Sequence, residues 1–183
     1  MPDIITLYHG TIHMFDTADV SRGKPFKDFG IGFYTSRDRG HAERMALRNR
    51  EIELSRIRKK DTDRRINALL YSFEFDPRTM NSLNTREFKT ADRHWMRFVI
   101  MNRAHKERQH NYDVVIGPTA NDNTLTAIGL FFAGAYGDIQ SDSAIDRLIE
   151  QIEPGKLPRQ YFFGSEKAAE LLILKAREIL SCS

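Results

Sequence analysis

The chain has 183 residues, of which 40% are hydrophobic and 29% are charged, and its formal net charge is +3. These proportions exclude wholesale disorder, and the positive charge is weaker than in most dedicated nucleic-acid-binding domains. A single cysteine, Cys182, excludes a disulfide framework or a cysteine-based metal site within one chain. No apolar run approaches the roughly 20 residues that span a bilayer, and the N-terminus lacks a signal-peptide pattern. We therefore expect a cytoplasmic protein without a membrane segment.

The pattern of apolar and polar residues predicts strands and helices that are mixed along the chain. A strand over residues 4–9 is followed by a glycine-rich loop, and Ser36 or Asp38 then begins a helix that continues through Ile52. Further strands are predicted over residues 71–76, 112–118 and 160–164, and further helices over residues 90–105, 124–136, 141–152 and 166–180, the last capped by Ser165. Regular βαβ repeats are missing, which favours an α+β fold. We expect one domain over residues 1–183, with residues 55–67 as a mobile connection.

Basic residues are concentrated between Arg44 and Arg65, where arginines and lysines clearly outnumber acidic residues. A solvated helix face followed by a polar loop explains such a run most simply. The alternative is a local patch for an anionic substrate or a partner protein.

Several catalytic motifs are missing from the sequence. It contains no phosphate-binding P-loop, no Gly-x-Gly-x-x-Gly after a strand, no His-Glu-x-x-His and no Gly-x-Ser-x-Gly. Of the six histidines only His9 and His13 are four residues apart, and Gly10 between them makes a helix there unfavourable. We therefore expect no metal site.

Two segments have the residue types of a binding site. In the first, His9 ends a strand and Gly10 follows, so that a ligand can approach the backbone while the imidazole offers a directional hydrogen bond. The second, Arg22 to Tyr34, combines glycines and cations that suit an anion with an aromatic face that suits a flat ring. The simpler alternatives are a polar residue at a strand end and a surface loop with aromatic anchors.

These segments belong to a longer ordered set of motifs. The set comprises Leu-Tyr-His-Gly, Lys-Asp-Phe-Gly-x-Gly-Phe-Tyr, Trp-x-x-Phe-Val-x-x-Asn-Arg, Tyr-Asp-Val-Val-Ile-Gly-Pro and a late Gln-x-x-Phe, between about residues 5 and 175. In this order they resemble the ADP-ribosyltransferase superfamily, in the branch with a His-Tyr-Glu triad that contains the diphtheria-toxin-like enzymes and the poly(ADP-ribose) polymerases. The sequence is especially similar to a family of uncharacterised bacterial proteins within that superfamily.

The resemblance implies a split β-sandwich with flanking helices and NAD⁺ in the cleft between two small sheets. His9 would bind the adenosine ribose, the Gly10 backbone would hold the nicotinamide carboxamide, and Tyr34 would stack on the nicotinamide ring. Gln160 matches the third position, so the implied catalytic set is His9, Tyr34 and Gln160. The implied residues around NAD⁺ are His9, Gly10, Thr11, Arg22, Lys24, Lys27, Gly32, Phe33 and Tyr34, with Arg22, Lys24 and Lys27 near the pyrophosphate.

Gln160 departs from the family pattern, which has Glu at this position. A glutamine amide can accept a hydrogen bond from a ribose hydroxyl, but it cannot take a proton as a carboxylate does. Another base would have to activate the acceptor, and Glu166, Asp122 and Asp28 are the candidates. Other residues are expected to have structural roles: Trp95 and Phe98 in the core, Arg103 paired with a carboxylate, Asp113 in a local cap or pair, and Asn121 at a helix N-terminus.

The function expected from the resemblance is NAD-dependent mono-ADP-ribosyl transfer to a protein, a nucleic acid or a small molecule. Family analogy further suggests the toxin of a bacterial toxin–antitoxin or conflict system, with a neutralising antitoxin protein as partner. Three alternatives remain open: an NAD glycohydrolase, a non-catalytic NAD- or nucleotide-binding module, and a nucleic-acid-binding domain built around the basic segment.

Overall fold

The computed structural model describes residues 4–57 and 65–181. Residues 58–64, in the expected mobile connection, lie outside this description. The elements in chain order are β1 (Ile5–Thr11), η1 (Val20–Arg22), β2 (Phe33–Ser36), α1 (Arg39–Arg56), β3 (Ala68–Phe75), η2 (Pro77–Ser82), β4 (Thr85–Glu87), α2 (Arg93–Ala104), β5 (Val114–Pro118), α3 (Asp122–Phe132), α4 (Asp142–Glu150), η3 (Pro154–Lys156), β6 (Arg159–Phe163), α5 (Glu166–Ala169) and β7 (Ile173–Leu180).

Helix starts follow local side-chain caps. The Asp38 carboxylate accepts a hydrogen bond from the His41 backbone N–H, so α1 begins at Arg39, and of the two predicted caps Asp38 is the one used. Asp92 and Ser141 cap α2 and α4 in the same way, and Asn121 caps α3 as predicted. Because these caps are encoded within a few residues, these four predicted helices are confirmed with ends shifted by a few residues.

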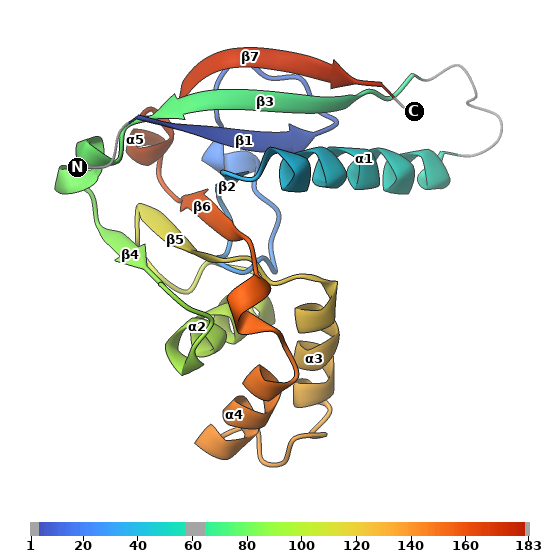
Figure 1. Cartoon of the computed structure of the whole chain (residues 1–183), viewed down its shortest axis with the longest axis vertical. Helices are drawn as coiled ribbons and strands as arrows, with labels where there is room; N and C mark the ends of the chain where they lie inside the picture. The colour runs from blue at the N-terminus through green and yellow to red at the C-terminus, as the bar shows by residue number, and fades with distance from the viewer. Residues whose placement is uncertain (1–3, 58–64, 182–183) are drawn as a thin grey trace.

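The strands form one mixed sheet with the order β4-β5-β6-β2-β1-β3-β7 among the described residues. Among the described strands, β4 and β5 run parallel, and the other neighbouring pairs are antiparallel. β1 pairs with β3 along its whole length, but it meets β2 only at Tyr8 opposite Ser36. The sheet therefore divides at this point into a first half (β1, β3, β7) and a second half (β2, β6, β5, β4), which separate in Figure 1. The arrangement confirms the predicted α+β class.

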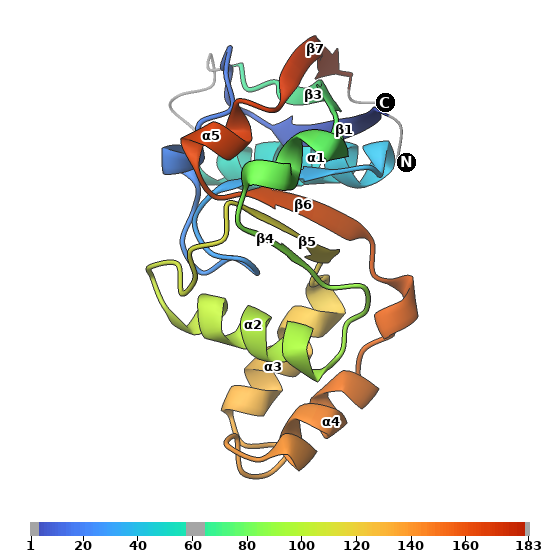
Figure 2. The same ribbon diagram turned by 90° about the vertical axis from the view of Figure 1, so that its left-hand side faces the viewer.

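Two apolar cores hold this arrangement together. Leu7 and Phe73 of the first half pack in one cluster with Phe33 and Phe163 of the second half, so this core joins the two halves. The other core lies between the second half and the helical lobe formed by α2, α3 and α4, which Figure 2 shows below the strands. Trp95 is fully buried in this second core, as predicted for the aromatic residues of α2.

The C-terminal segment differs from the prediction of a helix over residues 166–180, which is wrong. The helix ends at Ala169, and Ile173–Leu180 forms β7, paired antiparallel with β3. Without β7 the long strand β3 would have an open edge, and its backbone groups gain hydrogen bonds from this partner. Ser165 makes no cap with its side chain, because its hydroxyl donates to Asp113 Oδ1 at 2.6 Å.

Within the residues the structure describes, no helix combines the length and the apolar character needed to cross a membrane.

Candidate functional site

Gln160 lies at the start of β6, and its side chain is held in one orientation. The residue is only 6% exposed. Its Nε2 donates to Asp28 Oδ2 at 2.8 Å and to the Pro118 carbonyl oxygen at 3.2 Å. Both amide hydrogens are therefore used, since a carboxylate and a carbonyl only accept. Oε1 has no hydrogen-bond partner among the described residues. The fully buried polar atoms without a partner in this part of the chain do not include Oε1, so this oxygen is not fully enclosed.

Asp28, which supports Gln160, is itself buried and fully hydrogen-bonded. It is 4% exposed, and Arg103 donates to Oδ1 through Nε and Nη2, both at 2.7 Å. The Ala120 backbone N–H donates to Oδ2 at 2.9 Å. The expected pairing of Arg103 with a carboxylate is confirmed, and the pair compensates a charge that would be costly to bury alone. With donors on both oxygens, Asp28 is poorly placed to act as the base that the sequence left open.

Tyr34 lies on the same face of the sheet as Gln160, but its hydroxyl serves the loop before β2. It donates to the Gly30 carbonyl oxygen at 2.7 Å and accepts from the Phe29 N–H at 3.0 Å. Burial, followed by the negative charge of Asp28, raises the pKa of Tyr34 well above its usual range. The partly buried ring packs edge-on against Phe162 at 5.1 Å, on the side of the core next to the helical lobe.

His9 occupies the place where β1 and β2 separate. Its Nδ1 lies 2.7 Å from the Tyr34 carbonyl oxygen, which can only accept, so Nδ1 carries the proton. Burial is the main cause that lowers the pKa of His9, and the neutral ring therefore leaves Nε2 as an acceptor. The ring stacks on Phe33 at 4.4 Å. Because Phe33 and Tyr34 are successive strand residues, the His9 ring lies on the opposite face from the Tyr34 ring.

The glycines predicted to admit a ligand lie against protein atoms. A Cβ on Gly10 would stand 2.8 Å from the Ala42 carbonyl carbon and 2.9 Å from the Ala46 nitrogen, so α1 fills this space. A Cβ on Gly32 would lie 2.6 Å from the Phe163 carbonyl oxygen. Both glycines thus permit close packing of the sheet.

Thr11 and Phe33, which the resemblance places near NAD⁺, are buried. The Thr11 hydroxyl accepts a hydrogen bond from the His13 N–H at 3.2 Å. Phe33 belongs to the core between the two halves and supports the His9 ring from below. Phe33 therefore offers no polar group to a ligand, whereas the Thr11 hydroxyl accepts from the backbone.

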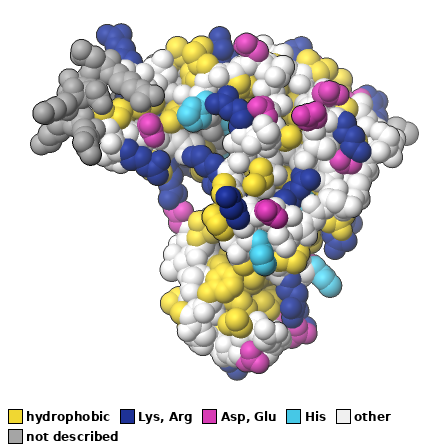
Figure 3. Space-filling model, turned by 180° about the vertical axis from the view of Figure 1, so that it is seen from behind, with side chains coloured by type: hydrophobic (Ala, Val, Ile, Leu, Met, Phe, Trp, Pro, Cys, Tyr) yellow, Lys and Arg dark blue, Asp and Glu magenta, His cyan; other side chains and the backbone are white. Residues whose placement is uncertain are grey.

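Cations gather beside Asp28. The pKa of Lys27 is lowered, mainly because its side chain is buried. The positive charge of Arg103 is the second cause, and the charges of Lys24 and Arg48 add smaller effects in the same direction. Arg22 lies in η1 and is exposed. Figure 3 shows a hollow between the α1 side of the molecule and the helical lobe, with Lys and Arg side chains along its α1 side. Such a group of cations favours an anion.

The other two candidate bases are surface residues. Asp122 pairs with Arg48 at 2.9 Å and so connects α3 with α1, while Glu166 begins α5 and is exposed. Neither makes a hydrogen bond to Gln160 in the part of the chain that the structure describes. Asp113, expected in a local pair, accepts from the Ser165 hydroxyl and the Asn84 N–H and pairs with Lys167 at 2.9 Å, which is confirmed.

The described part of the basic segment between Arg44 and Arg65 is consistent with a solvated helix face, its simplest explanation. Arg44 and Arg56 are exposed and lie within 3.8 Å and 3.9 Å of Asp38 and Glu53, respectively. The Arg50 Nε donates to the Ile66 carbonyl oxygen at 2.9 Å. Arg44 and Arg56 are therefore solvated side chains with partners on or next to α1, while Arg50 is half-buried and bonds to the segment before β3.

Sequence reasoning missed Phe26. This residue has a backbone φ of 59° and is 50% exposed, and Arg103 Nη1 donates to its carbonyl oxygen at 3.3 Å. A non-glycine residue at positive φ costs about 1–3 kcal/mol and often marks a functional loop. The sequence placed Phe26 in the segment from Arg22 to Tyr34, but it gave no sign of the positive φ, which only the structure shows.

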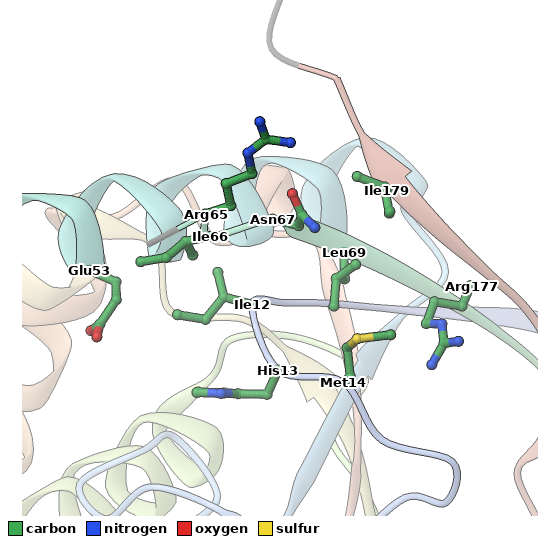
Figure 4. Close-up of a pocket in the computed structure, with 10 residues that line it drawn as sticks. All are labelled: Ile12, His13, Met14, Glu53, Arg65, Ile66, Asn67, Leu69, Arg177 and Ile179. Atoms are coloured by element: carbon green, nitrogen blue, oxygen red, sulfur yellow. The ribbon is translucent and has the colours of Figure 1, made fainter. Parts of the chain in front are cut away.

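A separate cavity of about 490 Å³ lies near the ends of β1, β3 and β7. Figure 4 shows an apolar floor that includes Ile12 and Leu69, with Arg177 at one side and Glu53 at the other. None of its lining residues belongs to the network around Gln160. Among the described residues, no group of three or more His, Cys, Asp or Glu side chains is arranged to hold a metal ion.

Fold and site together define an α+β protein with a buried polar network beside the division of its sheet. Comparison with protein-family models matches residues 5–174 to a family described as a protein of unknown function, DUF3990. The match covers most of the chain, and the chain belongs to this family. Neither the curated proteins nor the solved structures contain a match.

Proposed function

We propose that this protein is an NAD-dependent mono-ADP-ribosyltransferase with the split β-sandwich fold of the diphtheria-toxin-like and poly(ADP-ribose)-polymerase-like enzymes. The single-pair junction between β1 and β2, with a shared core between the two halves, supports such a fold. The sequence motifs supply the resemblance, and the order of His9, Tyr34 and Gln160 along the chain agrees with it.

The observation that carries the proposal is a pair of oriented hydrogen-bond acceptors. His9 donates through Nδ1 to the backbone, which leaves Nε2 as an acceptor. Gln160 donates through Nε2 to Asp28 and Pro118, which leaves Oε1 as an acceptor. Ribose hydroxyls are donors, so each acceptor suits one ribose of a dinucleotide. Because the His9 ring and Gln160 lie on opposite faces of the sheet, a dinucleotide would have to pass through the division between β1 and β2 to reach both.

Charge and aromatic rings near these acceptors suit the rest of the dinucleotide. The charges of Lys24 and Arg48 both act on Lys27, and these cations would attract a pyrophosphate, although Arg48 is already paired with Asp122. The exposed ring of Phe26 stands on the same loop, and a ring in that position can stack on a flat heterocycle.

The proposed reaction breaks the bond between C1′ of the nicotinamide ribose and the nicotinamide nitrogen. The electron pair of this bond leaves with nicotinamide, and the oxocarbenium-like ribose is attacked by a nucleophile of the acceptor. Gln160 Oε1 would hold the ribose hydroxyl during this step, but among the described residues the carboxylate that contacts Gln160, Asp28, already accepts hydrogen bonds at both oxygens and is not free to take the acceptor proton. The acceptor would therefore be a group that is already nucleophilic, on a protein, a nucleic acid or a small molecule. A cytoplasmic toxin with a neutralising antitoxin partner remains part of the proposal.

Titration calorimetry with NAD⁺, followed by an assay for nicotinamide release, tests the proposal. We expect binding in the micromolar to millimolar range, which H9A weakens at least tenfold while H94A, a change at an exposed histidine of α2, has no effect. Absence of binding at millimolar NAD⁺ would refute the proposal.

A non-catalytic NAD-binding module is the second candidate, because Gln160 replaces the expected carboxylate. Binding without nicotinamide release, in the presence of protein, nucleic-acid and small-molecule acceptors, would favour the module. Release at equal rates with and without acceptors would instead favour an NAD glycohydrolase.

A further inference from the structure

The orientation of the Gln160 amide is not determined by Gln160 alone. The oxygen and nitrogen of a side-chain amide are similar in size, so rotation by half a turn exchanges an acceptor for a donor. Here rotation would place Oε1 against Asp28 Oδ2 and the Pro118 carbonyl oxygen, at the 2.8 Å and 3.2 Å now occupied by hydrogen bonds. Three acceptors would then face one another, and a charge-assisted hydrogen bond would be lost.

We propose that Asp28 is a positioning residue that holds the Gln160 amide with Oε1 directed at a hydroxyl donor of the substrate. This inference rests on the proposed function, and it assigns Asp28 a role in selecting a ribose whose hydroxyl faces β6. A glutamine can replace the usual glutamate at this site because Asp28 removes the alternative orientation, in which the amide would present donors.

Asp28 is suited to this role because its own position is fixed from two other elements. Arg103 near the C-terminus of α2 holds Oδ1, and the Ala120 N–H before α3 holds Oδ2. The carboxylate is 4% exposed, so water does not compete freely for it. The network thus connects the loop before β2, two helices and β6.

D28N tests the role with the smallest change of shape. Arg103 donates to one oxygen of Asp28 and the Ala120 N–H donates to the other, so the amide NH2 group of D28N must face one of these donors. The charge-assisted hydrogen bond to Gln160 is lost, and the Gln160 amide is no longer held firmly in one orientation. We expect kcat for nicotinamide release to fall at least tenfold, while KM for NAD⁺ changes less than threefold.

The double variant D28N/Q160E separates positioning from structural support. A glutamate carboxylate has an acceptor at each oxygen, so one oxygen can accept from the amide at position 28 while the other still faces the ribose hydroxyl, although the hydrogen bond to the Pro118 carbonyl oxygen is lost. The exchange also preserves the net charge of the pair. We expect D28N/Q160E to recover most of the lost kcat, whereas Q160E alone places two carboxylates together and should perform worse than the double variant.

D113N is the matched control, because Asp113 is also a buried, hydrogen-bonded aspartate but contacts Ser165 and Lys167. It should lower the melting temperature with kcat within twofold of wild type. Wild-type kcat in D28N would overturn the inference. The inference would also be overturned if D28N/Q160E folds but does not recover activity.

A nuclear magnetic resonance measurement tests the positioning without NAD⁺. In the wild-type protein the Gln160 Nε2 hydrogens, identified by their loss in Q160E, should exchange with water at least tenfold more slowly than those of an exposed glutamine such as Gln140. Exchange at the rate of a free amide would overturn the inference even if D28N does not fold. Slow exchange without NAD⁺ binding would refute the proposed function alone.

Discussion

Replacing Tyr34 by phenylalanine removes one oxygen atom and two hydrogen bonds, and it tests whether this residue holds the loop before β2. The hydroxyl bonds to Gly30 and Phe29 at 2.7 Å and 3.0 Å, and both residues are buried. Water cannot readily replace the lost partner, so the orphaned N–H and carbonyl groups add to the cost. We expect a loss of about 2–4 kcal/mol in the free energy of unfolding.

The assay is thermal and urea unfolding of Y34F beside Y112F, whose hydroxyl makes no hydrogen bond among the described residues. A chain of this length has an unfolding entropy of about 0.4 kcal/mol per degree, so Y34F should melt about 5–10 °C below wild type. Its affinity for NAD⁺, measured where it is folded, should stay within about threefold of wild type, since the hydroxyl points into the protein. Equal melting of Y34F and Y112F would refute the assignment.

Three further predictions follow from the packing, the strained loop and a buried histidine. G10A forces a Cβ within 2.8–2.9 Å of α1 backbone atoms and should cost at least about 3 kcal/mol in urea unfolding, whereas G129A, with no atom within 4 Å, should stabilise α3 by about 1 kcal/mol. F26G relieves a positive φ and should raise the melting temperature while it weakens NAD⁺ binding severalfold in calorimetry; weaker binding without a gain in stability would contradict the strain. Burial lowers the pKa of His110 from 6.5 to about 4, so its contribution to stability is fully present above pH 6.5 and is lost as the pH falls toward 4. H110Q should flatten the loss of stability over this pH range and H94Q should not, as urea midpoints measured at each pH will show.

Local signals in the sequence predicted most helices and strands. Asp38 and Asn121 cap helices because a short polar side chain satisfies a free backbone N–H within the same few residues. The aromatic spacing around Trp95 predicted a buried helix face, since apolar residues at helical spacing gather on one side. Such interactions depend only on neighbours in sequence, so no tertiary information is needed to find them.

The candidate site was only partly visible in the sequence. His9, Tyr34 and Gln160 came from the motifs that carry the resemblance, but the motifs do not reveal which atom each residue leaves free. That property depends on bonds to Asp28, Pro118 and the backbone, which lie up to 132 residues away. The sequence therefore named candidate groups, and the fold determined their hydrogen-bonding direction.

Composition and local pattern by themselves determined the α+β class, the starts of most helices and the burial of Trp95. Only the tertiary structure decided that residues 173–180 form a strand, because the edge of β3 supplies hydrogen-bond partners that outweigh a helical spacing of apolar residues. It likewise decided that Asp28 faces Arg103 and Gln160 and that α1 fills the space beside Gly10. These contacts join segments that are far apart in the chain. A buried charge and a close contact between backbones are favourable only after the surrounding core has formed.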